Sequence, residues 1–153
     1  MSHEKRLQEL NLELPPPPKP AGTYLPTVRV GNLLYVAGHG PLRSNATLVT
    51  GRVGDDMNLE AGYQAARQVG LTMLATLKHD LGSLDKISRL IKTLGMVNST
   101  PDFHDHPKVI NGFSDLMVEV FGPQGRGARS AVGMAALPGN IAVEVETIFE
   151  LVD

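Results

Sequence analysis

A single arginine, Arg129, opens a run of small and apolar residues near the C-terminus, GRGARSAVGMAALPGNIAVEVETIFE. Such a run is typical of a strand inside a β-sheet. A guanidinium group is charged at physiological pH, and burying it without a partner costs several kcal/mol. We therefore expect Arg129 to meet an anion. By strand alternation it shares its face with small residues that leave room for a ligand: Ala131, Gly133 and Ala135.

The anion for Arg129 could belong to the protein or to a ligand. Glu144 and Glu146 share one face of the next strand. If the two strands paired as a hairpin across Pro138-Gly139, Arg129 would face the same side as the glutamates. Glu144 would still lie roughly 13 Å away at about 3.3 Å per residue, too far for an ion pair. Two readings stay open: a structural ion pair across a subunit contact, and a ligand carboxylate.

Histidines supply the other candidate side chains. His104 and His106 stand beside Asp102 and Asp105 in DFHDHP, which suggests a metal site. Two histidines two residues apart, just before a helix, are more often solvated loop residues, so we expect no metal here. The glycine-rich GPQGRG is followed by a strand, so it lacks the helix N-terminus of a phosphate-binding loop.

His39 lies in the sequence GHG, directly after Gly38, at the end of a predicted strand. A histidine at this place could act as an acid or a base, because its ordinary pKa is close to neutral pH. It could equally be a structural residue at the strand end. We keep His39 as a candidate substrate-binding residue.

Composition points to small-molecule chemistry or protein contacts. The chain has 153 residues, about one domain. Its formal net charge of -2 lacks the basic excess of nucleic-acid-binding domains. It has no cysteine, which excludes disulfides and thiol nucleophiles. No window resembles a signal peptide or a membrane span, so we expect a soluble, cytoplasmic protein without membrane or nucleic-acid partners.

Hydrophobic periodicity predicts an α+β protein. Residues 1–20 are expected to form an N-terminal helix and a proline-rich arm, a spacer more than a ligand for proline-binding domains, and residues 21–153 a single domain. The predicted elements are a helix within 2–14, a hairpin over 27–38, helices over 56–81 and 107–121, and strands over 86–99, 129–136 and 141–151.

Two helices can cover only one face of such a sheet. The strand over 129–136 is small or apolar on both faces, and the final strand has Ile148 on the face away from its main apolar row. An apolar second face needs a cover, and the chain has no element left to supply it. We therefore predict self-association.

The C-terminal segment ARSAVGMAALPGNIAVEVE resembles the signature of the RidA/YjgF imine deaminase family, with its Ala-Arg-Ser, Leu-Pro and Val-Glu spacing. Thr23-Tyr24 and the segment VGNLLYVAGHGP resemble the family's opening hairpin, and EAGYQAARQVGLTMLATLK resembles its first helix. The resemblance covers the chain from Ala21 to the end.

This resemblance implies a chorismate-mutase-like α+β fold, with a mixed, mainly antiparallel sheet and two helices on one face. It also implies a homotrimer with ligand sites between subunits. In the family, the arginine matching Arg129 binds the carboxylate of a 2-imino acid, and the glutamate matching Glu144 positions the attacking water. The residues matching Tyr24, Gly38 and Asn111 line the same cleft. No metal or cofactor is implied.

Three positions depart from the family pattern. Ala131 stands where deaminating members have Cys or Thr, Ala37 replaces a serine, and His39 replaces a glutamine. These changes keep the carboxylate clamp but remove polar contacts. We expect hydrolytic deamination of 2-imino or 2-enamino acids to 2-keto acids and ammonia. The alternative is a non-catalytic, trimeric carboxylate-binding or chaperone-like protein. The net charge of -2 does not favour the ribonuclease role attached to the family by name.

Overall fold

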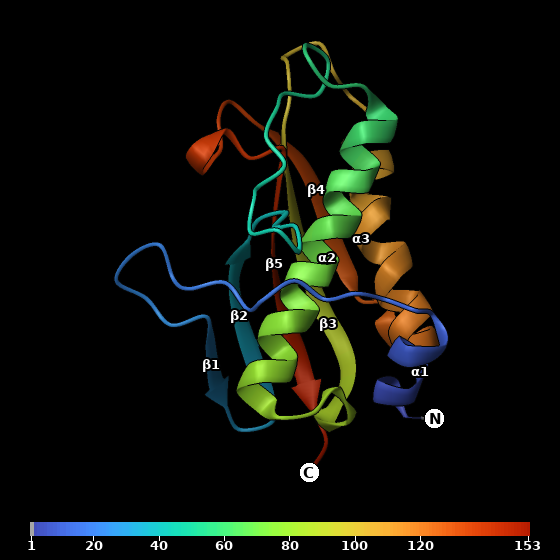
Figure 1. Cartoon of the computed structure of the whole chain (residues 1–153). Helices are drawn as coiled ribbons and strands as arrows, with labels where there is room; N and C mark the ends of the chain where they lie inside the picture. The colour runs from blue at the N-terminus through green and yellow to red at the C-terminus, as the bar shows by residue number, and fades with distance from the viewer. Residues whose placement is uncertain (1) are drawn as a thin grey trace.

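The computed structural model describes residues 2–153 and contains one five-stranded sheet with helices on one side (Figure 1). The order of the main strands and helices agrees with the prediction. The elements are α1 (His3–Glu9), β1 (Thr27–Val30), β2 (Leu33–His39), α2 (Leu59–Leu81), β3 (Ile87–Asn98), α3 (His106–Phe121), β4 (Ala128–Met134) and β5 (Val143–Leu151), with short 3-10 turns η1 (Leu84–Lys86), η2 (Gly122–Gly125) and η3 (Pro138–Asn140).

The sheet has the strand order β1-β2-β5-β3-β4, and only the β3-β4 pair is parallel. The prediction of a mixed, mainly antiparallel sheet is therefore confirmed. The hairpin considered between the last two strands is wrong, because β3 lies between β4 and β5. The last two strands, β4 and β5, each pair with β3 and do not pair with each other.

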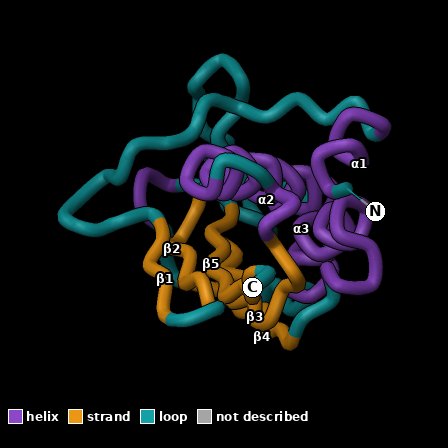
Figure 2. The backbone as a smooth tube through the Cα atoms, turned by 90° about the horizontal axis from the view of Figure 1, so that it is seen from below, coloured by secondary structure: helices purple, strands orange, loops and turns teal. Residues whose placement is uncertain are grey.

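Helices α2 and α3 pack on the same face of the sheet (Figure 2), as predicted. Alternate residues of β5 point into this layer, and Thr147 donates a hydrogen bond to the sulfur of Met73 on α2 at 3.2 Å. The largest side chains buried between the layers include Phe113, Phe149, Met73, Leu74, Leu77, Ile110 and Leu116. Burial of this apolar area supplies most of the stabilisation of the fold.

The opposite face of the sheet has no helix over it within residues 2–153 (Figure 2), and it carries exposed apolar side chains beside the glutamates of β5. Val132, Met134 and Tyr35 remain 36–45% exposed there. Met96, Leu137 and Ile141 form a small separate cluster on the same side. This exposed apolar face supports the expectation of self-association.

Helix α1 docks on the domain, although it ends earlier than its leucine spacing predicted. The prediction extended within residues 2–14, but the helix stops at Glu9, and Asn11 then adopts a left-handed φ of 51°. Leu7 is buried in the core. Asp85, in η1, accepts hydrogen bonds from the Ser2 hydroxyl and the backbone N–H of His3.

The proline-rich arm connects α1 to β1 by running across α2 (Figure 1). No helix of residues 2–153 combines the length and the apolar character that crossing a membrane requires.

Candidate functional site

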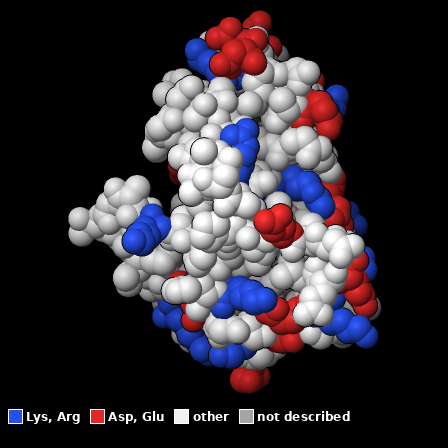
Figure 3. Space-filling view, in the orientation of Figure 1, with Lys and Arg blue, Asp and Glu red and all other residues white. Residues whose placement is uncertain are grey.

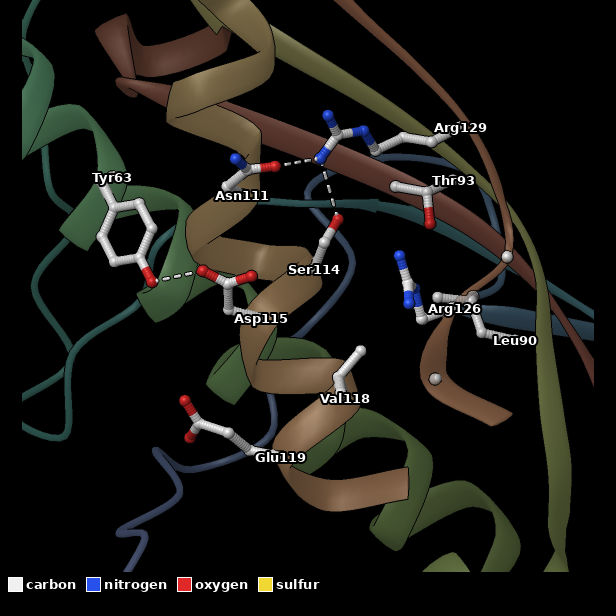
Figure 4. Close-up of a pocket in the computed structure, with 12 residues that line it drawn as sticks. Tyr63, Leu90, Thr93, Asn111, Ser114, Asp115, Val118, Glu119, Arg126 and Arg129 are labelled. Atoms are coloured by element: carbon white, nitrogen blue, oxygen red, sulfur yellow. Dashed lines mark hydrogen bonds between the residues drawn. The ribbon is translucent and has the colours of Figure 1, made fainter. Parts of the chain in front are cut away.

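Arg129 points from β4 toward α3, on the helix side of the sheet. It is paired in register with Thr93 of β3. Its Nη1 donates to Asn111 Oδ1 at 2.8 Å and to Ser114 Oγ at 3.1 Å, and its Nη2 donates to the Pro107 carbonyl at 3.4 Å. Figure 4 shows both α3 side chains pointing at the guanidinium. The structure thus brings Arg129 and Asn111 together.

The partners of Arg129 are all neutral. None of the ion pairs formed within residues 2–153 includes this arginine. Hydrogen bonds to neutral oxygens fix the orientation of a guanidinium but leave its charge uncompensated. The half-buried Arg129 is therefore oriented and charged, and available to an anion.

Arg129 lines a cavity of about 610 Å³ between α3, β4 and the turn η2, called here the Arg129 cavity. Its wall also includes Thr93 of β3 and Arg126, which precedes β4. Two carboxylates line it and already have partners: Asp115 accepts from the Tyr63 hydroxyl at 2.7 Å, and Glu119 accepts two hydrogen bonds from Arg67.

Glu144 lies in a different cavity, of about 830 Å³, called here the Glu144 cavity. Tyr24 and Gly38 line it as well, together with part of the arm, residues 18–22. The structure therefore groups four of the predicted site residues here, Glu144, Tyr24, Gly38 and His39, apart from Arg129. The phenol of Tyr24 is about half exposed and accepts a hydrogen bond from the backbone N–H of Ala21 at 3.1 Å.

Position 38 requires a glycine because its backbone lies in close contact with the Glu144 carboxylate. A Cβ atom at position 38 would lie 2.5 Å from Glu144 Oε2 and 3.0 Å from its Cδ. Any side chain at position 38 would displace the carboxylate. The absence of a side chain lets the strand approach the carboxylate group directly.

The Glu144 carboxyl holds a proton more tightly than an exposed glutamate. Burial raises its pKa, and the negative charge of Glu146 raises it further. A carboxylate with a raised pKa is a stronger base when it is ionised. An ionised Glu144 is thus a stronger base than an exposed glutamate would be.

His39 points away from Glu144 and into the helix layer. Its side chain is buried, Nδ1 lies 2.6 Å from the Ala37 carbonyl, and Nε2 lies 2.8 Å from Thr76 Oγ1 of α2. Burial lowers the pKa of this imidazole, although the bond to Ala37 opposes that effect. Both ring nitrogens have protein partners, so the imidazole is placed to hold β2 against α2.

His106 is not the solvated loop residue that the DFHDHP pattern suggested. It is the first residue of α3, it is half-buried, and its Nε2 lies 3.1 Å from Ser99 Oγ. The loop prediction is wrong because the helix begins one residue before Pro107. Within residues 2–153, no group of three or more His, Cys, Asp and Glu side chains is placed to hold a metal ion.

Arg129 and Glu144 occupy opposite faces of the sheet. Arg129 is in register with Thr93 of β3, and Thr93 is in register with Thr147 of β5. Glu144 lies three residues before Thr147 on β5. An offset of three reverses the face and adds roughly 10 Å along the strand, and two strand spacings add about 10 Å across. The expectation that both residues face the same way is wrong, because it assumed β4 and β5 to be paired.

Several residues of the Arg129 cavity were not predicted. Ser114 follows Asn111 by three residues, and i,i+3 helix neighbours lie side by side, so this contact could have been predicted once Asn111 was placed on a helix. Thr93 reaches the cavity only through the parallel β3-β4 pairing, and Arg126 through the turn before β4. No short sequence pattern predicts either contact.

Comparisons with known proteins identify the family of the chain. Residues 4–151 match the family model described as "YjgF/chorismate mutase-like, putative endoribonuclease". Protein TCP17 of Trypanosoma cruzi is 40% identical, over 95% of this chain and 91% of its own length. The 2-iminobutanoate/2-iminopropanoate deaminase of Dermatophagoides farinae is 32% identical, over 90% of this chain and 92% of its own.

Solved structures show the same fold over the full length. A crystal structure from Shewanella oneidensis, of a protein called a "putative endoribonuclease", superposes with a TM-score of 0.94 at 33% identity and covers 99% of this chain and 100% of its own. The N-terminal helix and arm are included in that match. With the family model covering nearly every residue, the chain belongs to the YjgF/RidA family and has its chorismate-mutase-like fold.

Proposed function

We propose that this protein hydrolyses 2-imino acids, or the 2-enamino acids from which they form, to 2-keto acids and ammonia. The observation that carries the proposal is Arg129, which neutral oxygens orient but no acidic side chain of residues 2–153 neutralises. The deaminase of Dermatophagoides farinae, 32% identical, supports the same reaction.

Arg129 would bind the carboxylate of the imino acid. A guanidinium has five N–H donors, and up to three of them serve Asn111, Ser114 and Pro107. The donors that remain can form a bidentate pair with a carboxylate. Because the protein already holds the guanidinium in place, little side-chain entropy is lost on binding.

Glu144 would orient and deprotonate the attacking water. As the water oxygen bonds to the imine carbon, its proton passes to the carboxylate and the C=N electron pair moves to nitrogen, which takes up that proton from Glu144. The hydroxyl proton of the carbinolamine then moves through Glu144 to the nitrogen, the C–N bond breaks to release ammonia, the C=O bond forms, and Glu144 is ionised again. Proximity and base catalysis account for this rate enhancement, and the scheme uses no metal or cofactor.

The two groups would meet only between copies of the chain. Arg129 and Glu144 lie on opposite faces of one sheet, in different cavities. The uncovered apolar sheet face calls for a neighbour. We propose a homotrimer in which the Arg129 cavity of one subunit faces the Glu144 cavity of the next. A cyclic assembly creates the same contact at each interface.

A binding protein without turnover is the second candidate. Ala131 follows Arg129 by two residues on the same face and packs on the core without adding a polar group. Ala37 likewise adds no hydroxyl next to Gly38. Such a site could hold a small carboxylate in place without activating water.

RNA cleavage receives no support from the charges. On the face shown in Figure 3, Lys and Arg side chains are interspersed with Asp and Glu and separated by uncharged residues. A ribonuclease normally presents a continuous basic surface to the phosphates.

A coupled assay tests the proposed function. A pyridoxal-phosphate-dependent threonine dehydratase, or an amino acid oxidase, supplies the imine, and the release of keto acid is followed with and without this protein. We expect faster release, which Arg129→Gln abolishes while the circular dichroism spectrum is unchanged. Wild-type protein that binds keto acids but gives no acceleration with any amino acid would show the second candidate to be right.

A further inference from the structure

A second arginine, Arg126, shares the Arg129 cavity. Figure 4 shows both guanidinium groups directed into the space between α3 and β4, although they come from different sides of it. Arg126 lies between the end of η2 at Gly125 and the start of β4 at Ala128. No ion pair within residues 2–153 includes Arg126.

The backbone on both sides of Arg126 is tightly packed. A Cβ atom at Gly125 would collide with the Met117 carbonyl of α3, and one at Gly127 would lie 2.8 Å from the Ile91 and Leu90 carbonyls of β3. These close contacts hold the chain between α3 and β3. Arg126 therefore extends into the cavity from a fixed backbone.

The carboxylates of the cavity wall do not neutralise the two arginines. Asp115 and Glu119 point toward α2 in Figure 4, away from both guanidinium groups, and are bound by Tyr63 and Arg67. Two like charges in one cavity repel each other until an anion binds. The uncompensated charge is thus greater than one carboxylate would balance.

Thr93 adds a polar group between the two arginines. Thr93 is 2% exposed and lines the cavity. Its hydroxyl can donate one hydrogen bond and accept others. A ligand oxygen in this cavity would accept the donated bond.

We propose that the ligand of this site carries two carboxylates: a dicarboxylic 2-imino or 2-keto acid whose 1-carboxylate binds Arg129 and whose distal carboxylate binds Arg126 and the Thr93 hydroxyl. The assignment of the 1-carboxylate rests on the proposed function. The Cα atoms of the two arginines are roughly 10 Å apart at about 3.3 Å per residue, a span that two long side chains converging on one short diacid can close.

Titration calorimetry with two acids of equal length tests this. The probes are 2-oxoglutarate and 2-oxopentanoate, which differ only in the distal carboxylate. We expect the full-length protein to bind 2-oxoglutarate about ten- to a hundredfold more tightly, the effect of one charge-assisted contact. Arg126→Gln should remove this preference and leave the affinity for 2-oxopentanoate within about twofold, whereas Arg129→Gln should weaken both acids.

The controls separate this proposal from a general charge effect. Arg43→Gln removes one exposed positive charge outside both cavities and should leave the preference intact. Arg126→Lys keeps the charge and should retain part of it. Equal affinity of the wild type for the two acids, including no binding of either, overturns the proposal, as does a preference that persists in Arg126→Gln. The proposed function fails on a different result, the absence of imine hydrolysis.

Discussion

Arg129 and Glu144 stand on opposite faces of one sheet, with one strand, β3, between their strands and an offset of three residues in register. A side chain cannot change its face without a register shift, so one chain cannot bring these two residues to one ligand. Every prediction about catalysis therefore depends on how two copies of the chain meet.

Two inactive variants should restore activity together. Arg129→Ala and Glu144→Gln, unfolded, mixed in equal amounts and refolded, form assemblies in which about a quarter of the sites pair an intact Arg129 with an intact Glu144 from the neighbour. The imine-hydrolysis assay should recover about a quarter of the wild-type rate. Each variant refolded alone is the control. A mixture as inactive as its components would mean that both residues of a site come from the same chain.

Replacing the proposed base should separate binding from turnover. Glu144→Gln keeps the shape of the side chain but cannot accept the proton of water, so we expect kcat to fall by about 10²–10⁴ while the affinity for 2-keto acids changes little. Steady-state kinetics and calorimetry measure the two effects. Loss of binding together with kcat would assign Glu144 to ligand binding instead.

The pH dependence should report the raised pKa of Glu144. The base must be ionised, so kcat rises with pH through a pKa above the ordinary 4.5 and is lost below it. Glu146→Gln removes a charge that raises this pKa, and the acidic limb of the profile should move to lower pH. An acidic limb that Glu146→Gln leaves in place would contradict the assignment.

A methyl group at position 38 should disturb the carboxylate without unfolding the strand. In Gly38→Ala the added Cβ collides with Glu144 Oε2. We expect kcat to fall about tenfold or more, as for a misplaced catalytic group. Gly22→Ala is the matched control, because its Cβ would lie 3.8 Å from the Tyr24 ring, an ordinary contact. Similar losses in both variants would point to a general change in the cavity.

Asp85 should stabilise the docked helix α1 in a pH-dependent way. Burial raises its pKa, but hydrogen bonds from Ser2, Glu4 and His3 outweigh that effect, so the pKa is lowered. A lowered pKa contributes stability above the unfolded value, near 3.8, that is lost as the pH falls through the folded value. Asp85→Ala should lower Tm by about 2–4 °C at pH 7 and by less at pH 3. An equal loss at both pH values would exclude the ionised carboxylate as the cause.

Local patterns predicted the elements well. The apolar spacing of α2 predicted the helix. Asn58, its N-cap, and Gly82, just after its last residue, predicted where it begins and ends. The pairing of strands could not be predicted in this way. Alternation indicates which residues share a face of a strand. It does not indicate that β4 pairs with β3, because α3 separates the two strands in the sequence and no short pattern predicts which strands become neighbours.

Part of the candidate site could likewise be predicted from local sequence, and part depends on how the strands pair. The small residues beside Arg129 indicated space for a ligand, and the family resemblance indicated Asn111, Glu144, Tyr24 and Gly38. The separation of Arg129 from Glu144 follows from the strand order alone. His39 was predicted to be a site residue because it follows Gly38. Adjacent strand residues point to opposite faces, so its ring lies against α2.

The proline-rich arm is anchored at both ends, by the docked α1 on one side and by β1 on the other, and its later residues form part of the wall of the Glu144 cavity. Four consecutive prolines make it a stiff rod instead of a slack tether. The arm is therefore a spacer of fixed length between α1 and β1, and a change in the number of its prolines would alter how it places the wall of the Glu144 cavity, Tyr24 included.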